Sequence, residues 1–131
     1  MKKTGILNSE LSSVIAAVGH TDLIVVCDSG YPIPKGTLRI DLALRRGSPG
    51  IVETVAEMAR ELEVEKITFA LESGQHCAGL IREVQALFPG AGHEGIGHDA
   101  FKALAARAVA IVRTGECIPY ANVILHAGVA F

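Results

Sequence analysis

The residues best suited to chemistry lie near the carboxyl end of this chain, where Tyr120 and Asn122 stand at the start of an apolar run. A strand predicted over residues 109–112 leads into a polar turn, and Gly115 and Pro119 are enough to form that turn without Tyr120 or Asn122. A phenol and an amide at the mouth of a strand offer donors, acceptors and a flat apolar face, which suit a small polyhydroxylated ligand. A tyrosine that packs and an asparagine that closes its own turn explain the pair equally well.

Asp28 and His20 form a second pair of polar candidates. Asp28 directly follows the apolar run of residues 23–27, and His20 lies in the turn that connects a predicted first helix to that run. If this helix and strand run antiparallel, the two residues lie at opposite ends of the sheet, and only a neighbouring subunit can bring them together. From the residues alone, we interpret His20 as a helix-end cation and Asp28 as a carboxylate that caps its loop.

His98 and Lys102 are four residues apart, so both are predicted on one face of a helix that begins near His98. Phe101 and Leu104 mark the core side of that helix, which leaves the basic pair at the margin of the core. Because the amino terminus of a helix favours anions, two basic residues there favour a functional role, although an exposed pair also fits the pattern.

Alternating helices and strands are predicted to position these residues. Helices are predicted over residues 9–18, 48–62 and 73–88 and from residue 98, and strands over residues 23–27, 39–42, 67–71 and 109–112 and from residue 123. We therefore predict a single domain over residues 1–131, an α/β fold in which a three-layer α/β/α sandwich surrounds a largely parallel, mixed sheet. Ligands in such folds collect at the carboxyl ends of strands, which is where Asp28 is expected.

Composition narrows the function classes. The chain has 131 residues, 50% of them apolar and only 20% charged, so we expect a homo-oligomer whose interfaces cover the excess apolar surface. A net charge of −2 without a basic stripe argues against a nucleic-acid partner. No apolar run is long enough to span a membrane, and the amino terminus lacks a signal-peptide pattern. Three widely separated cysteines favour reduced thiols in the cytoplasm.

Two further patterns carry no functional prediction. Residues 90–95 match the G-x-G-x-x-G dinucleotide fingerprint, but they follow a predicted helix end rather than a strand, so we expect a flexible loop. The cysteines and histidines show neither C-x-x-C nor H-x-x-x-H spacing, so we expect no metal site. Cys27 is expected to point to the sheet face opposite Asp28, which argues against a thiol nucleophile.

Taken together, the motifs of the chain resemble those of the D-ribose pyranase family over its full length. They are Gly-Ile-Leu-Asn-Ser-Glu-Leu at residues 5–11, Gly-His-Thr-Asp at 19–22, Asp-x-Gly-x-Pro-Ile-Pro at 28–34, His-x-x-Phe-Lys at 98–102, Arg-Thr-Gly-Glu at 113–116 and Pro-Tyr-Ala-Asn at 119–122. Each motif alone is weakly specific, whereas their occurrence in this order is highly specific. Ser29 and Tyr31, in the loop after Asp28, are the mild departures.

The resemblance implies an isomerase of D-ribose catabolism that interconverts the pyranose and furanose forms of the sugar in the cytoplasm. It also implies a homodecamer with binding sites between subunits, and no metal or organic cofactor. The proton donor of the family falls on His20. The sugar-binding residues of the family fall on Asp28, His98, Tyr120, Ala121 and Asn122, with Lys102 as a further candidate.

Ring interconversion passes through the open aldehyde, so the ring oxygen must gain a proton while the anomeric hydroxyl loses one. Histidine suits the donor role because its pKa lies near working pH, and one positioned acid or base contributes about 10²–10⁴ in rate. Two alternatives remain open. A fucose-type mutarotase would exchange the anomers of a different sugar, and a non-catalytic ribose-binding regulator would bind sugar without changing the rate of ring exchange.

Overall fold

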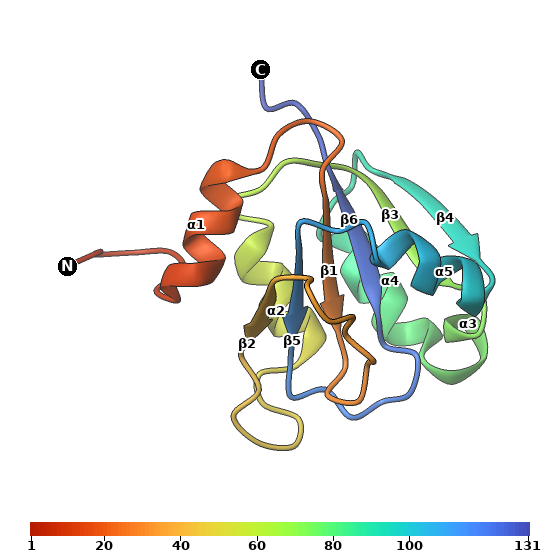
Figure 1. Ribbon diagram of the computed structural model, residues 1–131. Helices are drawn as coiled ribbons and strands as arrows, with labels where there is room; N and C mark the ends of the chain where they lie inside the picture. Colours follow the sequence, from red (N-terminus) through yellow and green to blue (C-terminus); the bar gives the residue numbers. More distant parts are fainter.

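The computed structural model describes residues Met1–Phe131, which form one six-stranded sheet with helices on both faces (Figure 1). The strands are β1 (Leu23–Cys27), β2 (Arg39–Asp41), β3 (Val64–Ala70), β4 (Gly92–Ile96), β5 (Ala110–Arg113) and β6 (Val123–Ala127). The helices are α1 (Ser9–Ala17), α2 (Ile51–Met58), α3 (Ser73–His76), α4 (Ala78–Ala86) and α5 (His98–Ala105). The α/β sandwich predicted from the sequence is confirmed.

The sheet is mixed, with the strand order β2-β5-β1-β6-β3-β4. Parallel pairs are formed by β1 with β5, β2 with β5 and β3 with β4, whereas β6 runs antiparallel to both of its neighbours, β1 and β3. Val123, the first residue of β6, therefore pairs with Val26 near the carboxyl end of β1. This reversed strand brings the segment that carries Tyr120 and Asn122 beside Asp28, and both lie at the carboxyl edge of the parallel strands.

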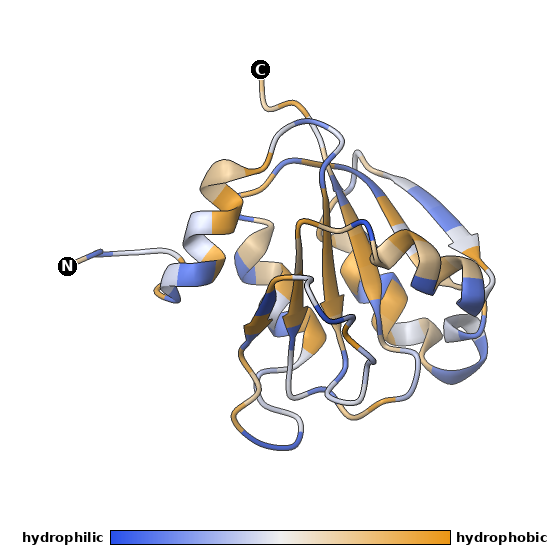
Figure 2. Ribbon diagram, in the orientation of Figure 1, coloured by the Kyte–Doolittle hydropathy of each residue, from blue (hydrophilic) through white to orange (hydrophobic).

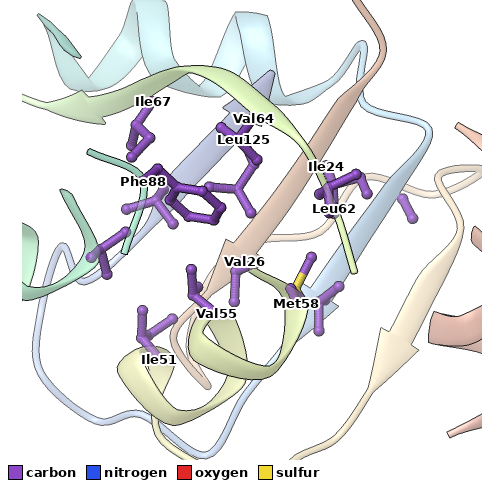
Figure 3. Close-up of a cluster of buried hydrophobic side chains, with 14 of the residues drawn as sticks. Ile24, Val26, Ile51, Val55, Met58, Leu62, Val64, Ile67, Phe88 and Leu125 are labelled. Atoms are coloured by element: carbon purple, nitrogen blue, oxygen red, sulfur yellow. The ribbon is translucent and has the colours of Figure 1, made fainter. Parts of the chain in front are cut away.

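Apolar side chains fill the space on both faces of the sheet. All five residues of β1 are buried, with Ile24 and Val26 on one face and Leu23, Val25 and Cys27 on the other. The first face packs against α2 and α4, and Figure 3 shows α2 side chains against those of β1. The second, smaller cluster packs under α5. In Figure 2 the central strands are mostly hydrophobic, whereas the hydrophilic segments lie on helices, loops and the edge strand β4.

Residues 92–96 form the edge strand β4, so the prediction of a flexible loop there was wrong. The strand pairs in parallel with β3, and an ion pair of 2.9 Å joins Lys66 to Glu94 across the two strands. Two glycines and three exposed residues give the segment no apolar alternation and a low strand propensity. A Cβ at Gly95 would come within 2.8 Å of a terminal side-chain carbon of Leu71, so a larger residue there would displace that exposed leucine.

Several element boundaries also differ from those predicted. The predicted third helix is interrupted at Cys77, which has an extended φ of −151°, and is thereby divided into α3 and α4. Helix α2 begins only at Ile51, after a cis Ser48–Pro49 peptide bond, and β3 begins at Val64 rather than at residue 67. None of the helices combines the length and apolar character that crossing a membrane requires.

Candidate functional site

Asp28 and Asn122 are joined by two hydrogen bonds where β1 ends and β6 begins. The backbone N–H of Asp28 donates to Oδ1 of Asn122 at 2.8 Å, and Nδ2 of Asn122 donates to Oδ2 of Asp28 at 3.1 Å. The other oxygen of Asp28 accepts the backbone N–H of Gly30 at 2.9 Å. Asn122 is only 4% exposed, whereas the Asp28 carboxyl is half-buried. Two residues that are distant in the sequence therefore form one rigid polar unit.

Burial raises the pKa of Asp28 above its ordinary value, and the hydrogen bonds from Gly30, Asn122 and Tyr31 oppose that rise. A partly desolvated carboxylate binds hydroxyl donors more strongly than one in bulk water, because the interaction is less screened. Burial, followed by the charge of Asp28, also raises the pKa of the neighbouring Cys27 to about 12. Cys27 is therefore an un-ionised core residue, and the prediction that it is not a nucleophile agrees with this environment.

The motif at residues 113–116 holds the loop that follows Asp28. Arg113 donates through Nε to the carbonyl of Ser29 at 3.1 Å, and Thr114 donates through Oγ1 to the carbonyl of Cys27 at 2.8 Å. The carbonyl of Glu116 in turn accepts the backbone N–H of Ser29 at 2.8 Å. These three hydrogen bonds hold the start of the loop in place, and they explain why Asp28 has a defined position in a glycine- and proline-rich segment.

Tyr120 and His98 form a second pair at the same edge of the sheet. Tyr120 has a φ of +61°, which is uncommon for a large side chain, and its ring meets the ring of His98 edge to face at a centroid distance of 5.1 Å. His98 is the first residue of α5, and its Nδ1 is buried without a hydrogen-bond partner. The structure therefore brings together four of the residues singled out from the sequence: Asp28, His98, Tyr120 and Asn122.

Three residues that follow β3 were missed in the sequence and belong to this neighbourhood. Ser73 donates through Oγ to the carbonyl of Tyr120 at 2.7 Å, and the ring of His76 stacks on the Tyr120 ring at 4.8 Å. Glu72 accepts the backbone N–H of His98 at 3.4 Å, and its other carboxyl oxygen is buried without a partner. A signal was available, because these residues follow a predicted strand just as Asp28 does.

Ala121 and Lys102 have different surroundings from the other candidates. Ala121 is fully buried in the core between its two polar neighbours, so its side chain is not available to a ligand. Lys102 lies one turn along α5 from His98 and is exposed to solvent.

His20 is not part of this cluster within one chain. It lies in the turn before β1, where its Nε2 pairs with Oε2 of Glu65 at 2.9 Å, and both side chains are about half exposed. The adjacent Thr21 bonds to the carbonyl of Ala127, the last residue of β6, whereas Asn122 precedes the first. His20 and the Asp28–Asn122 pair therefore lie at opposite ends of β6. Five strand residues at about 3.4 Å each separate them by roughly 17 Å.

The polar cluster is open on one side. Asp28 lines a hollow of about 270 Å³ together with Ser29, Arg46, Glu116 and Cys117, but Tyr120, Asn122 and His98 do not line it. No group of three or more histidine, cysteine, aspartate or glutamate side chains is arranged to hold a metal ion. Within one chain, the cluster therefore offers hydroxyl-binding groups on an open surface rather than an enclosed pocket.

Comparison with known proteins gives matches over the whole chain. A model of the RbsD / FucU transport protein family matches residues 1–130. D-ribose pyranases of Chloroflexus aggregans and Bacillus cereus (strain B4264) are 51% and 47% identical to the chain over 131 residues, with full coverage of both sequences. Among solved structures, Bacillus subtilis RbsD complexed with D-ribose superposes with a TM-score of 0.95 at 46% identity and full coverage of both chains. The fucose mutarotase of Streptococcus pneumoniae in complex with L-fucose gives a TM-score of 0.79 at 25% identity, covering 99% of this chain and 100% of that one.

Proposed function

The chain belongs to the RbsD / FucU transport protein family, and on that premise we propose that it is an isomerase that interconverts the pyranose and furanose forms of D-ribose. One observation carries the proposal: the hydrogen-bonded Asp28–Asn122 pair lies beside Tyr120 and His98 in a chain 51% identical to a D-ribose pyranase. Fucose chemistry is less well supported, because the fucose mutarotase of Streptococcus pneumoniae shares only 25% identity.

Sugar binding falls to the groups at the carboxyl edge of the sheet. The Asp28 carboxylate accepts a sugar hydroxyl, and its orientation is fixed by Asn122 and Gly30. The phenol of Tyr120 and the imidazole of His98 supply further donors and acceptors, and the unpartnered Nδ1 of His98 has free hydrogen-bonding capacity. Ala121 contributes backbone groups, and Lys102 is an additional contact from the exposed face of α5.

Proton transfer falls to His20. As the ring opens, the histidine delivers a proton to the ring oxygen, and the anomeric hydroxyl releases its proton to solvent. As a different hydroxyl closes the new ring, the histidine takes the proton of that hydroxyl, and the carbonyl oxygen regains one from solvent. Glu65 orients the imidazole, because its carboxylate accepts a hydrogen bond from the Nε2–H of His20 at 2.9 Å and leaves Nδ1 for the sugar. No covalent intermediate, metal or organic cofactor is needed for this sequence of steps.

The separation of His20 from Asp28 has a structural consequence. Roughly 17 Å of β6 lies between them, so one pentose cannot contact both within one chain, and the working site takes His20 from a second chain. Exposed apolar side chains support assembly, since Leu7, Leu44 and Leu71 are 74%, 82% and 61% exposed. We take the homodecamer implied by the family resemblance as the assembly. We also place it in the cytoplasm, where its three free thiols remain reduced.

Saturation-transfer NMR tests the activity, because it reads exchange between ring forms directly for each sugar offered. We expect accelerated pyranose–furanose exchange of D-ribose by the wild-type protein, and a His20→Ala variant that assembles and binds ribose but exchanges it at least about 100-fold more slowly. Exchange confined to fucose anomers would support the mutarotase alternative. Ribose binding without any acceleration would support a regulator, and wild-type exchange by His20→Ala would exclude His20 as the donor.

Subunit complementation tests the shared site. His20→Ala and Asp28→Asn proteins, each inactive alone, are dissociated, mixed and reassociated, and mixed oligomers are verified by native mass spectrometry. Some interfaces then combine His20 of one parent with Asp28 of the other, so activity should return in part. Verified mixed oligomers without recovered exchange would mean that each site is built within one chain.

A further inference from the structure

The ring of Tyr120 lies between two histidine rings, only one of which has a role in the proposed reaction. His98 meets it edge to face, with ring planes at 79°, and His76 lies against it as a stacked ring, with planes at 27° and centroids 4.8 Å apart. Both geometries fall within the range preferred by aromatic pairs. His98 comes from α5 and His76 from α3, so two separate elements contact one phenol.

The backbone of Tyr120 is held in a conformation that a tyrosine does not favour. Its φ of +61° is in the left-handed region, where Cβ crowds the following carbonyl. The carbonyl of Tyr120 accepts two hydrogen bonds, from Oγ of Ser73 at 2.7 Å and from the backbone N–H of Asn122 at 2.9 Å. Ser73 is fully buried, so this anchor is part of the protein interior. These two hydrogen bonds fix the backbone of Tyr120, and the stacked ring of His76 then restricts the orientation of the phenol ring.

From these contacts we infer that His76 is a positioning residue for Tyr120, holding the phenol plane in the orientation that meets the bound sugar. The inference rests on the proposed sugar-binding role of Tyr120. His76 is exposed and lies on a helix of four residues, so its ring fills no core space and has no other packing task. It acts through Tyr120, and it does not exchange protons with the substrate.

The kinetic test separates KM from kcat for ribose ring exchange in the assembled protein. His76→Ala should raise KM about three- to tenfold, the range expected for the loss of an aromatic pair, and leave kcat within about twofold. His76→Phe keeps a ring that can stack and should restore the wild-type KM. Gln75→Ala, a change at the neighbouring exposed position on the same helix, is the matched control and should change neither constant.

A second measurement does not depend on activity. The chain has no tryptophan and two tyrosines, so in a Tyr31→Phe background Tyr120 is the sole emitter of protein fluorescence. His76→Ala in that background should expose Tyr120 to acrylamide quenching, and His76→Phe should reverse the change. This arm tests the stacking even if the wild-type protein shows no ring exchange, in which case the proposed function fails separately.

Three results would overturn the inference. The first is an unchanged KM in His76→Ala. The second is a fall in kcat at constant KM, which would make His76 a proton-transfer group. The third is a His76→Phe protein that is as impaired as His76→Ala, because a stacked ring would then not be the relevant property.

Discussion

Replacement of Asn122 by alanine should weaken both the stability and the sugar site of this protein, because Asn122 makes two hydrogen bonds to Asp28. The variant leaves the backbone N–H of Asp28 without its acceptor and one carboxylate oxygen without its donor. Asn122 is 4% exposed, so water has only restricted access to the vacated position.

The size of the effect follows from the two bonds. A neutral hydrogen bond contributes about 0.5–1.5 kcal/mol and one to a charged group about 1.5–3 kcal/mol. Asp28 is only half-buried, so water replaces part of the lost interaction, and we expect the free energy of unfolding to fall by about 2–3 kcal/mol at neutral pH. Ribose binding should weaken as well, because the Asp28 carboxylate loses the group that orients it.

The loss should depend on pH with a defined sign. The Asn122 hydrogen bond lowers the pKa of Asp28, so the pKa of Asp28 in the folded variant lies above that in the folded wild type. The stability advantage of the wild type is therefore complete above both folded-state values and shrinks as the pH falls through them. In acid, where Asp28 is protonated, only the smaller, neutral contribution remains.

Urea unfolding followed by circular dichroism, at one protomer concentration, measures these differences. A double-mutant cycle with Asp28→Ala should give a coupling energy of about 1–3 kcal/mol. Asn8→Ala is the matched control, because Asn8 caps α1 through one bond to the Leu11 amide at 2.9 Å. It should cost about 1 kcal/mol, with no coupling to Asp28. A loss below about 1 kcal/mol for Asn122→Ala at neutral pH, or a coupling near zero, would refute the reasoning.

Four further predictions concern charge, thiols, packing and metals. Burial raises the folded-state pKa of Asp28 above its ordinary 3.8. Asp28 therefore contributes fully to stability below pH 3.8, and this contribution is lost as the pH rises through the raised pKa. Asp28→Asn should abolish this loss of stability, and pH profiles of unfolding that are parallel for the variant and the wild type would contradict the prediction. Only Cys117 is an exposed thiol and Cys27 has its pKa raised to about 12, so Ellman's reagent should titrate one thiol per native chain, whereas equal rates for all thiols would argue against the burial pattern. Gly115→Ala would force a Cβ onto two carbonyl oxygens of the loop before α2, so the free energy of unfolding in urea should fall by more than about 2 kcal/mol. Gly90→Ala is the control and should cost little, because Gly90 faces open space. Equal losses in the two variants would rule out the clash. Ring exchange should survive exhaustive chelation, and loss with EDTA that zinc restores would overturn the acid–base mechanism.

Much of the sheet could be predicted because its central strands are buried on both faces. Residues 23–27 and 123–125 are continuous apolar runs, which is the pattern that a doubly covered strand requires. The rule that ligands collect at the carboxyl ends of strands then predicts a ligand-binding role for Asp28, which follows such a strand. Its partnership with Asn122 could not be read from the sequence, because it depends on β6 entering the sheet in the reverse direction between β1 and β3.

The edge strand β4 and the contact between His76 and Tyr120 were not predicted from the sequence for a different reason. An edge strand such as β4 buries little, so it carries no apolar pattern, and its glycines resemble those of a loop. The relation of His76 to Tyr120 depends on a left-handed backbone at Tyr120 and on the interruption of a helix at Cys77. The left-handed φ of Tyr120 is uncommon for a large side chain, and no local sequence signal marks it.

The reversed direction of β6 also explains why the proposed site is divided between chains. A strand antiparallel to its neighbours places its amino end beside Asp28 and its carboxyl end beside the turn that carries His20. Each chain therefore has the proposed sugar-binding groups at one end of the sheet and the proposed proton donor, His20, at the other. A closed ring of identical contacts can pair every donor with a binding group of the next subunit, whereas an isolated chain can pair none. In the proposed assembly, the apolar residues exposed at the surface have a functional reason, because the association proposed to bury them also completes the proposed site.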